Sequence, residues 1–197
     1  MNQEQMKELI LQSIEHERGG VKLYEAALTC AVDDRLRAEW ERYLEETETH
    51  VTVLEDVARV MNLDVEAMTP GRRIVKDLGA SLLGAIQSAA DADEPQAAQI
   101  VACECVVLAE TKDHANWQLL GKCAKELSGP AAEALKGAYE EIEDQEDEHL
   151  YHTKGWCREL WVQSLGLVAV LPPPEEKQHV KTAIGAARAE QQAELIR

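Results

Sequence analysis

Apolar residues recur along this chain at alternating steps of three and four positions, and no stretch alternates strictly between apolar and polar residues. This is the period of an α-helix with one buried face, whereas a half-buried strand would show a period of two. Capping residues and first-turn prolines stand at three places, namely Asp33-Asp34, Pro95 and Ser128-Gly129-Pro130. The pattern therefore predicts an all-α protein with four long helices, at about residues 3–30, 35–62, 95–127 and from 131 onward.

The connections between the predicted helices differ in length. Short turns join the first helix to the second and the third to the fourth, whereas residues 63–94 separate the second from the third. Within that connection, RRIVKDLGASLLGAIQSAA has helical periodicity and predicts an extra helix. Two hairpins tied by a long crossover form a four-helix bundle. We expect the bundle in residues 1–168, and a Pro-rich linker with a helical tail in residues 169–197.

Polar residues interrupt the predicted buried stripe of each long helix near its middle. In chain order the interruptions are Glu17, then Thr47 and His50, then Glu110 and His114, and finally Glu146 and His149. An unpaired carboxylate in a protein core is costly, so such carboxylates are normally paired, protonated or bound to a cation. A single buried polar residue is usually satisfied by hydrogen bonds. Because four interruptions coincide at mid-bundle depth, they predict one shared buried site.

The first two helices look like a divergent copy of the last two. Glu17 and Tyr24 have the same spacing as Glu110 and Trp117. A two-fold arrangement of carboxylates and histidines around one cavity suits two first-row metal ions. Such a metal pair can reduce dioxygen or peroxide.

The sequence resembles the ferritin-like superfamily, whose motif is Glu, Glu-x-x-His, Glu and Glu-x-x-His on four successive helices. The stretch RAEWERYLEETETHVTVLEDVARVMNLD, followed by the crossover helix, further resembles the YciE/YciF-like branch of stress-associated bacterial proteins. The likeness covers roughly residues 5–160. Carried over by position, it implies five metal ligands: Glu17, His50, Glu110, Glu146 and His149.

The chain departs from this motif in the second helix, where Thr47 stands in place of the expected Glu. Two residues are candidates for the missing ligand. Glu46 is adjacent but about 100° further round the helix, and His114 comes one turn after Glu110. In the third helix, Glu104 is an alternative to Glu110, which we favour from the repeat with the first helix.

The composition of the chain limits the kinds of molecule that it is expected to bind. Lys+Arg 20 against Asp+Glu 37 gives a net charge of −17, which repels nucleic acid and anionic lipid. We expect no membrane association either, because the longest apolar run, LGLVAVL, is too short to cross a bilayer and the start lacks a signal peptide. Five cysteines without a C-x-x-C pair favour reduced thiols, as in a cytoplasm.

Two functions remain as hypotheses. The first is a ferritin-like protein with a dinuclear iron or manganese site, acting on dioxygen or peroxide as an oxidase, peroxidase or catalase-like oxidoreductase in a stress response. A homodimer is expected by analogy alone. The second is a metal-free or single-metal ferritin-like protein with a structural or interaction role and no catalysis. Thr47 is the residue that favours the second hypothesis.

Overall fold

The computed structural model describes residues 1–173 of the 197-residue chain. Within these residues it contains no β-strand, so the all-α prediction is confirmed. The helices are α1 (Gln3–Cys30), α2 (Asp34–Val60), α3 (Pro70–Ala90), α4 (Pro95–Glu126) and α5 (Pro130–Ser164). The extra helix expected between the second and third long helices is α3. The expected helical tail falls in residues 174–197, outside the described part of the chain.

Capping side chains and first-turn prolines explain where several of the helices begin. The Asp33 carboxylate accepts a hydrogen bond from the Arg35 N–H at the start of α2, and the Thr69 hydroxyl accepts one from the Arg72 N–H at the start of α3. Prolines open α3, α4 and α5, at a position where the missing N–H would have no helical partner. Before α5, Gly129 adopts a φ of 72°, a left-handed conformation that a side chain disfavours. These local signals explain why the helix starts were readable from the sequence.

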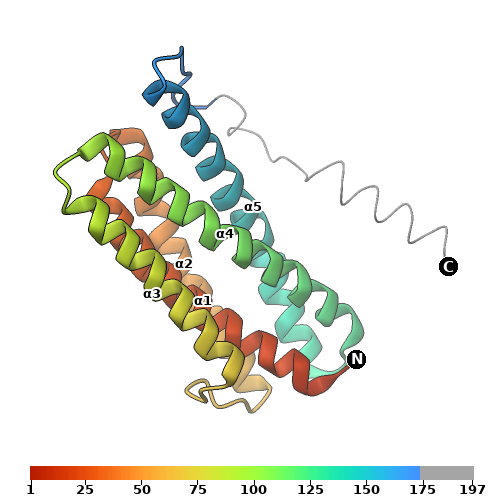
Figure 1. Cartoon of the computed structure of the whole chain (residues 1–197). Helices are drawn as coiled ribbons and strands as arrows, with labels where there is room; N and C mark the ends of the chain where they lie inside the picture. The colour runs from red at the N-terminus through yellow and green to blue at the C-terminus, as the bar shows by residue number, and fades with distance from the viewer. Residues whose placement is uncertain (174–197) are drawn as a thin grey trace, which may run out of the picture.

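Four of the helices contact one another in a closed ring. Helix α1 packs against α2 and α4, and α5 packs against the same two helices. Across the enclosed space α1 faces α5 and α2 faces α4, and there only side chains meet, such as Tyr24 with His149 and His50 with Trp117. Helix α3 lies outside this ring, against α1 and α4 (Figure 1). The space enclosed by α1, α2, α4 and α5 is therefore lined by one face of each helix.

Two apolar clusters fill the two ends of this enclosed space. One includes Tyr24, Trp40 and Trp156, and the other includes Ile14 and Trp117. On each of the four helices, most of the buried polar residues lie between the part in one cluster and the part in the other; Ser13 and Gln99 are the exceptions. The polar residues therefore form a layer in the middle of the core, shielded at both ends by large side chains.

The polar interruptions predicted from the sequence are all buried except His114, which is half-buried. Helix α1 continues without a break through Gly19 and Gly20. A Cβ at Gly20 would lie 3.2 Å from the Thr47 methyl group, so this glycine allows α1 and α2 to approach closely. Within residues 1–173, none of the helices combines the length and the apolar content that a bilayer span requires.

Candidate metal site

Five of the seven predicted site residues meet in the middle layer of the core. Glu17 comes from α1, His50 from α2, Glu110 from α4, and Glu146 and His149 from α5. The most exposed of the five, Glu110, has only 4% of its surface accessible. Two sets of three offer atoms close enough to hold a metal ion, namely Glu17, His50, Glu146 and Glu110, Glu146, His149. Glu146 belongs to both sets.

Several polar atoms that face one another in this layer form no well-directed hydrogen bond among the described residues, although some of them lie close together. They include Glu17 Oε2, Glu110 Oε2, both carboxylate oxygens of Glu146, and Nδ1 of His50 and of His149. His50 Nδ1 lies 2.9 Å from Glu146 Oε1 and 3.6 Å from Glu17 Oε2. His149 Nδ1 lies 3.8 Å from both Glu110 Oε2 and Glu146 Oε1. Buried polar atoms are normally satisfied, so this set has the properties of a cation-binding site.

The two histidines are held with Nδ1 directed inward. His50 Nε2 donates to Gln145 Oε1 at 2.8 Å, and His149 Nε2 donates to Glu46 Oε2 at 2.8 Å. A neutral histidine that donates from one ring nitrogen keeps a lone pair on the other, which is how carboxylates and amides orient metal-binding histidines. Glu46, considered as a ligand from the sequence, therefore lies behind His149, on the side away from the inward-facing carboxylates.

Two aromatic residues orient the carboxylates in the same way. Tyr24 donates its hydroxyl to Glu110 Oε1 at 2.8 Å, and the Trp117 indole N–H donates to Glu17 Oε1 at 2.8 Å. Each carboxylate thus has one oxygen fixed by a neutral donor and the other directed toward the histidines. The predicted repeat pairs Glu17 and Tyr24 of α1 with Glu110 and Trp117 of α4. In the structure the two helices contact each other through this repeat, because the aromatic residue of each helix donates a hydrogen bond to the carboxylate of the other.

The expectation that His114 shares the buried face with Glu110 needs correction. His114 is half-buried, and its Nε2 lies 2.6 Å from Asp147 Oδ1, away from the middle layer. The inward position one turn after Glu110 belongs to Asp113, which is 4% exposed and has an unpartnered Oδ1. Sequence reasoning missed Asp113. Periodicity allowed either residue, because Asp113 lies four residues and His114 three residues before buried Trp117.

Thr47 contributes no ligand atom to the site. It is buried, but its hydroxyl donates to the Tyr43 backbone carbonyl at 2.8 Å, within α2 itself. Glu104, the alternative to Glu110, is exposed and accepts a hydrogen bond from Trp161. The structure therefore places Glu110 at the site and leaves the α2 position without a carboxylate.

Burial and mutual repulsion make the carboxylates of this layer reluctant to ionise together. Burial raises the pKa of Glu110 to about 8 and that of Glu146 to about 7, and the neighbouring carboxylates add to both shifts. Burial also raises the pKa of Asp113 well above its ordinary value, again with help from its acidic neighbours. Burial lowers the pKa of His50, but the carboxylates of Glu17 and Glu146 outweigh it and raise this pKa to about 11. The layer therefore favours cations, whether protons or metal ions.

The chain was also compared with known proteins. No family model matches it, and no curated protein or solved structure shows significant similarity to it.

Proposed function

We propose that this protein is a ferritin-like four-helix bundle that binds a dinuclear iron or manganese centre and reacts with dioxygen or peroxide. The observation that carries the proposal is that Glu146 belongs to both possible ligand sets, Glu17–His50–Glu146 and Glu110–Glu146–His149. A carboxylate common to two neighbouring metal sites is suited to bridge them. Oxygen and imidazole ligands together favour iron or manganese over metals that prefer thiolates.

The surrounding residues support such a centre. Gln145 and Glu46 hold the imidazoles, and Tyr24 and Trp117 hold one oxygen of each outer carboxylate. The apolar clusters above and below the layer exclude bulk water. A pair of redox-active metals would supply the electrons that reduce dioxygen or peroxide. Under this proposal the protein is a stress-related oxidase, peroxidase or catalase-like enzyme of the YciE/YciF-like branch, acting in the cytoplasm and as a homodimer.

A second candidate is a metal-free or single-metal protein with a structural or interaction role. Two observations favour it: Thr47 provides no ligand, and Glu110 and Glu146 have raised pKa values that allow protonation near neutral pH. Protonated carboxylates could then satisfy their neighbours by hydrogen bonds.

Metal analysis separates the two candidates. Protein purified without chelator, then reconstituted with Fe(II) or Mn(II) without oxygen, should hold about two metal ions per chain. The Fe(II) form should consume dioxygen in an oxygen-electrode measurement. A single bound ion would favour the single-metal candidate, and none after reconstitution would rule out the dinuclear centre.

A shared carboxylate can be tested directly. Glu146→Gln should lower the metal content to about one ion or none, because both ligand sets lose an oxygen donor. Glu141→Gln, an exposed change on the same helix, is the matched control and should still hold about two. Circular dichroism should show equal helix content in both variants. If Glu146→Gln remains folded and still binds as the control does, Glu146 is not the bridging residue.

A further inference from the structure

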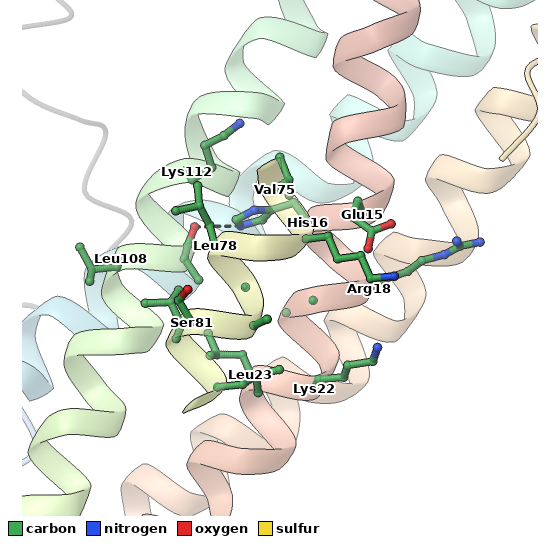
Figure 2. Close-up of a pocket in the computed structure, with 18 residues that line it drawn as sticks. Glu15, His16, Arg18, Lys22, Leu23, Val75, Leu78, Ser81, Leu108 and Lys112 are labelled. Atoms are coloured by element: carbon green, nitrogen blue, oxygen red, sulfur yellow. Dashed lines mark hydrogen bonds between the residues drawn. The ribbon is translucent and has the colours of Figure 1, made fainter. Parts of the chain in front are cut away.

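A pocket lies outside the metal layer, between α1, α3 and α4. Figure 2 shows it as a space on the α3 side of α1, with Leu23 and Leu108 among its lining residues. Its volume is about 390 Å³, within the range of pockets that hold small molecules. The candidate metal site does not account for it, because none of the proposed ligands lines it.

The wall of the pocket is aliphatic. The principal apolar side chains are Leu23, Val75, Leu78, Leu82, Leu83 and Leu108. Leu78 and Leu108 are 58% and 61% exposed, so apolar surface continues to the mouth. Gly19 and Gly79 also line the pocket, and an added Cβ at either would meet nothing within 4 Å. The missing side chains leave room for an occupant with an aliphatic body.

The charged residues around this pocket are mostly basic, in contrast to the rest of the chain. Its lining includes Arg18, Lys22, Lys76 and Lys112 but one carboxylate, Glu15. The whole chain has almost twice as many acidic as basic residues, 37 against 20. A basic rim around an aliphatic space complements a molecule with an apolar body and an anionic head.

Two of the cations are available for such a head. Arg18 is already paired with Glu55 and Glu66, and the Lys112 ammonium donates to Asn116 Oδ1 at 2.6 Å. Lys22 and Lys76 are exposed and form no ion pair within residues 1–173. In Figure 2 the Lys22 side chain lies at the edge of the pocket.

We propose that this pocket binds an aliphatic carboxylate, with its chain between α1, α3 and α4 and its head at the rim that carries Lys22 and Lys76. Binding requires no metal, so the proposal stands or falls separately from the dinuclear centre. Gly20 and Ala109 line the pocket, and each lies within three residues of a proposed ligand, Glu17 or Glu110.

Calorimetry with octanoate, decanoate and dodecanoate, each below its micelle concentration, tests the proposal. One carboxylate should bind per chain, with affinity rising roughly fourfold for each CH₂ group that becomes buried. Gly79→Leu, which fills the pocket, should weaken dodecanoate binding by about tenfold or more. Gly84→Leu is the matched control, because it lies on the same helix, has open space and does not line the pocket. Equal loss in both variants, or in neither, would overturn the proposal.

The anionic head is tested with a second set of ligands and variants. Dodecanol should bind more weakly than dodecanoate; equal or tighter binding of the alcohol would show that the basic rim has no role. The double variant Lys22→Gln/Lys76→Gln should weaken dodecanoate binding roughly threefold to fivefold, the effect of losing exposed ion pairs, and leave dodecanol unchanged. Lys122→Gln/Lys125→Gln removes the same charge from exposed positions elsewhere and should leave both affinities unchanged.

A second copy of the chain is the competing occupant. Sedimentation of the ligand-free protein should give the same oligomeric state for the native chain and for Gly79→Leu. If Gly79→Leu dissociates an oligomer that Gly84→Leu preserves, the apolar face is an interface between subunits and the carboxylate proposal is wrong.

Discussion

Compared with the expected ligand set, Thr47 removes one buried carboxylate and Asp113 adds one. Thr47 occupies the α2 position where the ferritin-like motif has a carboxylate, and its hydroxyl is bonded to its own helix. Asp113 adds a buried carboxylate on α4, one turn after Glu110. Burial raises the pKa of Asp113 well above its ordinary value, and the carboxylates of Glu17 and Glu146 add to this shift. The number of buried acids thus matches the motif although their distribution does not.

If the layer binds two metal ions as proposed, Asp113→Asn should weaken the binding of one of them, because Asp113 is a buried carboxylate beside Glu110 in the same layer. We expect a loss of about 10-fold to 100-fold in affinity for one of two ions, the range for residues close to a metal centre. Competition with a chromophoric chelator measures this effect. Asp144→Asn, an exposed change on α5, provides the control. Unchanged affinity in Asp113→Asn would assign Asp113 a hydrogen-bonding role only.

At this scale the sequence named seven site residues, of which five meet, but it could not distinguish Asp113 from His114 as the inward-facing residue. Steps of three and four both follow Glu110 in a helical stripe, and either residue could have been the inward one. The choice depends on the rotation of α4 against α1 and α5. That rotation results from packing between helices, which periodicity does not specify.

At the scale of the helices, α4 and α5 pack closely where Gly121 faces Tyr139. A Cβ at Gly121 would lie 2.5 Å from the Tyr139 ring, closer than real contacts allow. Gly137, on α5, has nothing within 4 Å of its Cβ position. The two glycines therefore have different roles although both lie inside helices.

Gly121→Ala should lower the free energy of unfolding by about 1–3 kcal/mol, because the ring must move from its packed position. Gly137→Ala should raise it by about 0.5–1 kcal/mol, because alanine has the higher helix propensity and meets no obstacle. Urea unfolding followed by circular dichroism measures both. Stabilisation by Gly121→Ala would show that Tyr139 can turn aside at little cost.

Across the whole molecule, the buried acids link stability to pH. In the metal-free protein the pKa of Glu110 is raised from 4.5 to about 8 and that of Glu146 from 4.5 to about 7. Between pH 4.5 and the raised pKa of each group, the folded state therefore binds more protons than the unfolded state. The stability that results is fully present below pH 4.5 and is lost as the pH rises toward 8. His50 acts in the same direction above pH 6.5, since its pKa is raised to about 11.

Chelator-treated protein should accordingly lose about 2 kcal/mol or more of stability between pH 5 and pH 8. In a thermal melt this corresponds to a fall in Tm of roughly 5 °C. Metal-loaded protein should lose less, because bound metal replaces the protons and stabilises the folded state. A metal-free Tm that rises over this interval would contradict the raised pKa values.

The sequence by itself determined the helices and the identity of most polar residues in the middle layer of the core. Periodicity, capping residues and prolines act locally, so helix starts at Asp34, Pro95 and Pro130 lie within about one residue of their predicted positions. The sequence also predicted that polar residues on four helices lie at the same depth in the core, because this inference requires only the helical period.

The tertiary structure decided which atoms face the site and what lies around it. It placed Glu46 behind His149, turned His114 toward Asp147, and brought Asp113 into the core. It also revealed the pocket between α1, α3 and α4, to which three separate segments contribute. These features depend on how helices rotate and pack against one another, and that arrangement follows from the sum of many long-range contacts rather than from any local pattern.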